Sequence, residues 1–203
     1  MNAKTSEVIR KKASEFIAVH GYDALDLAML VEDGLPIEVV DRQARSKQQL
    51  LFSLLEEIMV ELIDALQVSV LPIEDAKARL QAFIRLHIRF HATRSPEVLI
   101  ATTELKNLDP SNYKKIVALR NLYEGHVRDV IQRGCDQKCF SVADVGVAAA
   151  SLITMLTYST RRQGEISDVS MEAFTTDMIE LSLRLVGATE KPACIIIPFP
   201  TRS

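Results

Sequence analysis

Residues 46–67 read SKQQLLFSLLEEIMVELIDALQ, and this stretch decides the fold class. Its apolar side chains recur every three or four residues, which is the spacing of one face of an amphipathic α-helix. Ser46, followed three residues later by Gln49, forms a capping box, which is a start signal for a helix. We therefore predict a long helix that begins after Ser46 and ends near Leu71 and Pro72.

The same helical spacing continues on both sides of this stretch. Ser95 and Asp109 each precede a proline, as capping residues do, and Gly21 and Gly134 stand where a helix is expected to end. The sequence therefore predicts an all-α chain. Besides the long helix, we expect helices over residues 6–20, 26–33, 74–94, 96–108, 110–133, 142–162 and 171–186, and a short one opened by Pro36.

Three short helices followed by a long one are the arrangement of a helix-turn-helix unit with a connecting helix. We accordingly divide the chain into a helix-turn-helix unit over residues 1–48 and a helical body over 49–188. The remaining residues, 189–203, are too few and too rich in proline to form a domain.

Charge and composition exclude several functional classes. The net charge is −3 over 203 residues, which argues against a protein that coats nucleic acid through a basic field. No apolar run reaches the roughly 18 residues of a membrane span, and the first twelve residues lack the apolar region of a secretion signal. Three cysteines cannot all pair, which favours a reducing compartment. We expect a cytoplasmic protein without a membrane partner.

Residues 145–156, VGVAAASLITML, are apolar on nearly every side of the expected helix. A helix without a polar face must be covered on two sides. One cover is the core of the same chain, and the other is expected to be a second copy packed against the last two helices. The alternative is a central helix of a monomer.

No catalytic or metal site is expected from the residue patterns. His87 and His91 have the spacing of a metal-binding pair, but Ile88 stands where the zinc-protease motif requires glutamate. Cys135 and Cys139 lack a second pair of ligands. The chain has no phosphate-binding glycine loop and no Gly-x-Ser-x-Gly motif. We therefore predict no cofactor and no enzyme, and a helical-bundle enzyme is the weakest alternative.

The N-terminal segment resembles the TetR family of transcriptional regulators. The resemblance rests on motifs that follow in the family's order: Ala13-Ser-Glu-Phe16, His20-Gly21-Tyr22-Asp-Ala24, Gly34-Leu35 and Ser46-Lys47-Gln-Gln-Leu50-Leu51. It implies a DNA-binding helix-turn-helix that reads a double-stranded operator. The residues expected to contact DNA are Lys12, Pro36, Ile37, Glu38, Asp41, Arg42, Arg45 and Lys47.

The segment that matches the recognition helix departs from the family pattern. Pro36 stands where the family has a capping Ser or Thr, and Asp41, Gln43 and Ala44 replace its aromatic cluster. An aspartate repels the DNA phosphates that a tyrosine would contact. Seven basic and eight acidic residues through Gln49 leave this region at −1, whereas a DNA-docking domain is normally basic.

The helical body resembles the effector domain of TetR regulators of fatty-acid and steroid catabolism. The matching motifs are His87-Ile-Arg89-Phe90-His91, Glu104-Leu105-Lys-Asn-Leu108, Tyr113, Arg120-Asn-Leu-Tyr123-Glu124, Gly134 and Phe140. The resemblance implies a hydrophobic effector, with an acyl-coenzyme A thioester as one candidate. We expect the ligand to contact His87, Phe90, His91, Arg120, Tyr123, Tyr158 and Arg162. The alternative for Arg120 is a surface ion pair with Glu124 at i, i+4.

Together these patterns predict a homodimeric, ligand-responsive repressor that a hydrophobic molecule releases from operator DNA. The main alternative keeps the TetR fold but has lost sequence-specific DNA binding, and acts by sensing a ligand or by pairing with a partner. The substitutions at Asp41, Gln43 and Ala44 motivate this alternative.

Overall fold

The computed structural model describes residues 3–28, 46–166 and 168–188, and these contain helices and no β-strand. The all-α prediction is therefore confirmed. The elements are α1 (Ala3–His20), α4 (Lys47–Ser69), α5 (Ala76–Thr93), α6 (Ser95–Thr103), the 3₁₀ helix η1 (Leu105–Asn107), α7 (Pro110–Asp136), α8 (Val145–Arg161), α9 (Gln163–Ile166) and α10 (Met171–Leu185). The short helix expected after Pro36 lies outside the described residues, as does most of the helix expected at 26–33.

Several predicted helix ends are present as hydrogen-bonded caps. Ser46 Oγ accepts from the Gln49 backbone N–H at 3.0 Å, and Asp109 Oδ1 accepts from the N–H groups of Ser111 and Asn112. Gly21 follows α1 with φ +80°, a left-handed conformation that glycine adopts without strain. The start signals read from the sequence at Ser46 and Asp109 and the stop signal at Gly21 are confirmed.

The start of α6 differs from the prediction. Ser95 is the first residue of the helix, and Arg94 is the capping residue without a side-chain cap hydrogen bond. Arg94 belongs to both helix ends, because its N–H bonds to Phe90 O of α5 at 3.0 Å and its carbonyl oxygen accepts from the Val98 N–H of α6 at 2.9 Å. Pro96 is tolerated because the first-turn N–H that it lacks would have no intrahelical partner. The helix also ends earlier than predicted, at Thr103, and η1 takes the chain toward α7.

Gly134 does not end α7, which continues to Asp136. The glycine instead lets the Phe140 ring pack against the helix backbone, because a Cβ at this position would overlap the ring. The N–H groups of Cys139 and Phe140 both bond to Gly134 O, at 2.9 and 3.0 Å. A close approach of a side chain to the helix, rather than a helix end, is therefore what requires this glycine.

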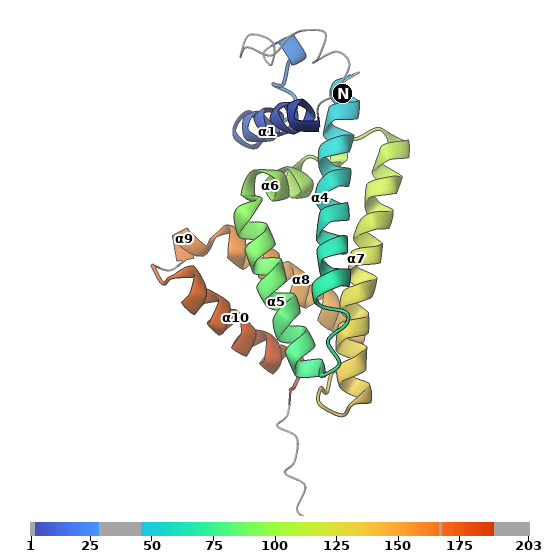
Figure 1. Ribbon diagram of the computed structural model, residues 1–203, viewed down its shortest axis with the longest axis vertical. Coiled ribbons are helices and arrows are strands. Elements are labelled where there is room, and N and C mark those ends of the chain that lie inside the picture. The colour runs from blue at the N-terminus through green and yellow to red at the C-terminus, as the bar shows by residue number, and fades with distance from the viewer. Residues whose placement is uncertain (1–2, 29–45, 167, 189–203) are drawn as a thin grey trace, which may run out of the picture.

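Helix α5 is the central element of the body (Figure 1). It contacts α4, α6, α7, α8 and α10, and Phe83 and Ile84 are completely buried within it. Helix α1 lies across α6 at one end of the body. A second hydrophobic cluster joins Ile9, Ala13 and Ile17 of α1 to the first turns of α4 and to Ile100 of α6. In the described part of the chain no helix is long and apolar enough to cross a membrane.

The two glycines of α7 give a matched stability test. We expect Gly134→Ala to lower the free energy of unfolding by about 1–3 kcal/mol, because the new methyl group overlaps the Phe140 ring. Gly125→Ala, where no atom lies within 4 Å of the added Cβ, should raise it by about 0.5–1 kcal/mol through helix propensity. Urea unfolding followed by circular dichroism measures both, and equal effects would contradict the packing role of Gly134.

Candidate ligand cavity

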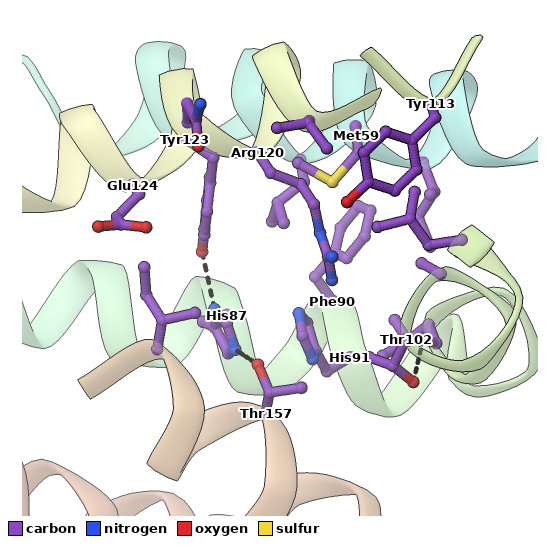
Figure 2. A pocket seen from close by; sticks show the side chains of 18 residues that line it. Met59, His87, Phe90, His91, Thr102, Tyr113, Arg120, Tyr123, Glu124 and Thr157 are labelled. Carbon is purple, nitrogen blue, oxygen red and sulfur yellow. Dashed lines mark hydrogen bonds between the residues drawn. The ribbon is translucent and has the colours of Figure 1, made fainter. Parts of the chain in front are cut away.

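A cavity of about 380 Å³ lies between α4, α5, α6, α7 and α8 (Figure 2). This volume falls in the range of small-molecule sites, about 300–1,000 Å³. Each of the five helices contributes at least one apolar side chain to its walls, and η1 contributes another. The apolar lining residues are Ile58, Met59, Leu62, Phe90, Val98, Ala101, Leu105, Val117 and Ile153.

His87 holds the inner wall of the cavity together. Its side chain is buried, with Nδ1 2.7 Å from Tyr123 Oη and Nε2 3.1 Å from Thr157 Oγ1. These partners come from α7 and α8, so one imidazole on α5 joins three helices. Burial is the main reason that the pKa of His87 lies well below its usual value, and burial also raises the pKa of Tyr123. Both groups are uncharged at neutral pH.

His91 lies one turn further along α5 and stacks on His87, with ring centroids 3.8 Å apart. Burial lowers the pKa of His91 to about 4, so this ring is also neutral at pH 7. Its Nδ1 atom is buried and has no hydrogen-bond partner within the described residues. The inner part of the cavity therefore presents an uncharged wall with one unused polar atom.

Arg120 supplies positive charge at the exposed side of the cavity. In the described residues Glu124 pairs with Arg128, and no ion pair joins it to Arg120, so the surface-pair interpretation is wrong. The Arg120 side chain reaches from α7 toward Phe90 and His91 (Figure 2). The cavity is thus lined by the cationic Arg120, by the carboxylate of Glu124 and by two neutral imidazoles.

The structure brings five of the seven predicted ligand residues together. His87, Phe90, His91, Arg120 and Tyr123 all line the cavity. Tyr158 and Arg162 do not line it. Tyr158 is 50% exposed on α8, its ring lies under the guanidinium groups of Arg161 and Arg162, and Arg162 Nε bonds to Glu165 Oε2 at 2.7 Å.

The sequence does not predict Thr157, the neighbour of Tyr158, as a residue that lines the cavity. Thr157 points inward and bonds to His87, whereas Tyr158, one residue further and about 100° around the helix, points outward. It also missed the contributions of α4, α6 and η1, which the apolar spacing of these segments could have indicated. These missed lining residues are Ile58, Met59, Leu62, Val98, Ala101, Thr102 and Leu105.

Most of the predicted DNA-contacting residues lie outside the described part of the chain, namely Pro36, Ile37, Glu38, Asp41, Arg42 and Arg45. Lys12 is half-buried on α1. Lys47 Nζ donates to Asp23 O at 2.9 Å and lies 4.5 Å from the centre of the Tyr22 ring. Lys47 therefore also ties the start of α4 to the segment after α1.

Gln48, at the start of α4, joins the segment after α1 to the chain between α6 and α7. Its Nε2 atom donates to Tyr22 Oη at 3.0 Å and to Asn107 O at 2.6 Å, while Oε1 accepts from the Asp109 N–H at 3.0 Å. One side chain thus connects the segment after α1 with the chain between α6 and α7.

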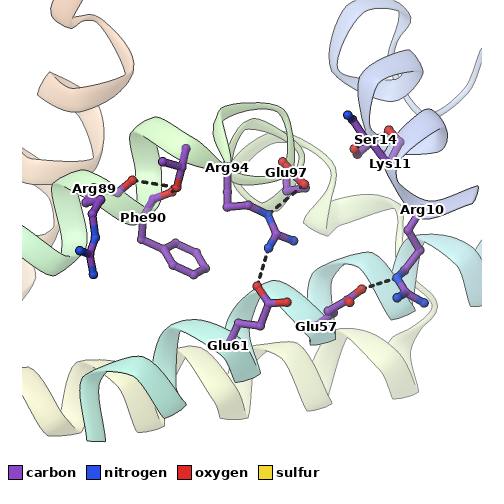
Figure 3. A network of polar contacts seen from close by, with 10 residues as sticks. Arg10, Lys11, Ser14, Glu57, Glu61, Arg89, Phe90, Arg94 and Glu97 are labelled. Atoms are coloured by element: carbon purple, nitrogen blue, oxygen red, sulfur yellow. Dashed lines mark hydrogen bonds and ion pairs between the residues drawn. The ribbon is translucent and has the colours of Figure 1, made fainter. Parts of the chain in front are cut away.

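Ion pairs connect the same helices on another face (Figure 3). Arg94, at the corner between α5 and α6, pairs with Glu61 of α4 and Glu97 of α6. Arg10 of α1 pairs with Glu57, one turn before Glu61 on α4. Each of these pairs is partly exposed, so its individual contribution to stability is small, but together they fix how α1, α4 and α6 meet.

A largely apolar cavity between the helices of a bundle, with α1 packed against α6 of its wall, is the arrangement of a helical ligand-binding domain. Residues 74–185 match the family model described as the tetracyclin repressor-like C-terminal domain, which covers more than half of the chain. The chain belongs to the TetR family.

Solved structures of similar proteins have the same fold. A regulatory protein of the TetR family from Rhodococcus RHA1 superposes with a TM-score of 0.85 at 21% identity, over 93% of this chain and 100% of that one. The TetR-family regulator PfmR from Thermus thermophilus gives a TM-score of 0.78 at 24% identity, over 90% and 99%. AibR, solved with isovaleryl coenzyme A and operator DNA, gives 0.76 at 20% identity, over 91% and 100%. Among curated proteins, none matches the sequence.

The neutral histidines predict how stability depends on pH. In the unfolded chain His91 takes up a proton near pH 6.5, whereas in the folded protein its pKa is about 4. The unfolded state therefore binds more protons in this window, and stability falls as the pH falls from about 6.5 to about 4. His91 alone contributes about 3 kcal/mol of this loss.

Urea unfolding between pH 7 and pH 4 measures this dependence in the wild type and in His91→Phe, which cannot titrate. We expect the stability difference between the two proteins to shift in favour of the variant as the pH falls. A difference that stays constant over this range would contradict the burial of a neutral His91.

Proposed function

We propose that this protein is a homodimeric, cytoplasmic transcriptional repressor that a hydrophobic small molecule releases from operator DNA. The observation that carries the proposal is the shared role of α6. Val98 and Ala101 line the cavity, while Ile100 of the same helix packs with the buried face of α1. A molecule that enters the cavity therefore contacts the helix on which the N-terminal unit rests.

The cavity suits a ligand with an apolar chain and an anionic head group. The chain would lie against the apolar walls, and the head group would meet Arg120 at the outer end. An acyl-coenzyme A thioester has both features. The structural similarity to AibR, solved with isovaleryl coenzyme A and operator DNA, supports this ligand class.

Ligand binding would act by shifting the protein between two arrangements of its N-terminal units. The bound ligand would stabilise the position of α6 in which the cavity is larger. Helix α1 would move with α6 because the two helices share one hydrophobic cluster. Gln48 and the Arg94 ion pairs transmit the same displacement to α4. In a dimer, such a shift changes the spacing of the two DNA-reading units, which operator recognition fixes at about one helical turn.

The dimer would form through α8 and α10. Helix α8 buries Leu152 and Leu156 in the core but leaves Val147 66% exposed on its other side. Leu181 on α10 is 49% exposed. A second copy that covers these side chains would satisfy the apolar character of residues 145–156.

Operator release gives the direct test. Fluorescence anisotropy with duplexes from the region upstream of the gene should show binding that weakens with salt, and decanoyl-coenzyme A should reverse it. Val117→Phe, on α7, fills the cavity without changing α6, so we expect this variant to keep its DNA affinity and to lose at least roughly tenfold in ligand sensitivity. Ala118→Phe, on the exposed side of α7, is the matched control and should respond like the wild type.

Each part of the proposal can fail separately. If no duplex is retained but the ligand still binds, the protein is a ligand sensor with the TetR fold that has lost DNA readout. If DNA binds but Val117→Phe is released as readily as the wild type, the cavity is not the effector site.

The oligomeric state has its own test. We expect the wild type to sediment at twice the monomer mass and Val147→Glu to sediment as a monomer, because each symmetric interface would bury two carboxylates. Val19→Glu on α1, where Val19 is 76% exposed, is the control and should remain dimeric. A wild-type monomer, or a dimeric Val147→Glu, would refute the α8 interface.

A further inference from the structure

A second, smaller cavity of about 210 Å³ lies next to the ligand cavity, where α5, α6, α8 and α9 meet. His91, Val98 and Thr157 line both cavities and therefore form the partition between them. The remaining lining residues of this second cavity are Ala92, Ser95, Thr160, Arg161, Gln163, Gly164 and Met171.

Two buried side-chain atoms in the described part of the chain have no hydrogen-bond partner, and both belong to residues that line the second cavity. One is His91 Nδ1 and the other is Thr160 Oγ1. An unpaired polar atom in a protein interior is destabilising, because it has lost its hydrogen bonds to water and gained none in their place. Two such atoms beside one hollow indicate that something other than the protein satisfies them.

The chemistry of the two atoms limits what can bind there. His91 is neutral because burial lowers the pKa of its ring to about 4, so it offers no positive charge to an anion. The Thr160 hydroxyl can donate or accept. Arg161 also lines this cavity, but its guanidinium lies over the exposed Tyr158 ring, 5.5 Å from the ring centre. A charged carboxylate at the two unpaired atoms would therefore lose its hydration without gaining a cationic partner there. A hydroxyl group matches them without this penalty.

We propose that the second cavity is a polar subsite of the ligand cavity, which binds a hydroxyl group at the far end of an apolar ligand. The inference rests on the proposed function, since it assumes that a ligand chain fills the larger cavity. The chain passes the partition beside His91, and its hydroxyl bonds to His91 Nδ1 or Thr160 Oγ1. The effector class is therefore an ω-hydroxylated acyl chain, with its head group near Arg120.

Isothermal titration calorimetry with decanoyl-coenzyme A and 10-hydroxydecanoyl-coenzyme A tests the subsite. The two probes differ by one hydroxyl, and we expect the wild type to bind the hydroxylated probe about tenfold more tightly, since the new bond satisfies a buried atom. Thr160→Val should reduce this ratio several-fold, and adding His91→Phe should abolish it.

Thr102→Val is the matched control for Thr160→Val. Thr102 lines the larger cavity, but its hydroxyl already bonds to Leu99 O at 2.8 Å, so its loss should leave the ratio unchanged. The free protein gives a second readout. Thr160→Val should not lower the melting temperature, because the hydroxyl that it removes has no partner in the described part of the chain.

The outcomes separate the two proposals. Equal binding of both probes by the wild type means that water fills the second cavity, and overturns the subsite while the proposed function stands. Binding of neither probe overturns the acyl-thioester ligand and the subsite together. A clear fall in the melting temperature of Thr160→Val shows that the hydroxyl is bonded within the protein, which also overturns the subsite.

Discussion

The hydrogen bonds of His87 constrain the rest of the helical body. A fully buried imidazole is stabilised when both ring nitrogens have partners, because an unpaired buried polar atom is costly. Tyr123 from α7 and Thr157 from α8 meet this requirement. Apolar contacts alone would allow α7 and α8 to slide against α5, whereas these two bonds select one register. The inner wall of the cavity follows from that register.

The cavity and the N-terminal unit are linked because neighbouring helices serve both. Helix α6 has one face in the cavity and another against α1, and α4 begins beneath α1 and ends in the main core. A rigid helix cannot move at one face only. The contacts of Gln48 and Arg94 reinforce this link between the helices at two separate places. A displacement of α6 is therefore expected to move α1 as well.

The sequence was most informative where local chemistry decides the structure. The spacing of residues 46–67 and the capping side chains of Ser46 and Asp109 predicted the helices that carry the fold. The sequence is less informative where contact with a residue distant in the chain determines the local structure. Gly134 was read as a helix end because its actual reason, the Phe140 ring, depends on tertiary packing. For the site, motif order located five of the seven ligand candidates in the cavity, but could not show which side of α8 faces inward.

The gradient of charge along the cavity also limits how a ligand can act. Under the proposed function, an anionic head group would be favoured near Arg120 and disfavoured near Glu124 and the neutral histidines, so the ligand would bind in one orientation. Its apolar part would then lie against Ala101 of α6 and Leu105 of η1. The length and shape of the chain, rather than its charge, would therefore determine how far α6 is displaced. The proposed regulator would distinguish ligands by their chains, while the head group would anchor them.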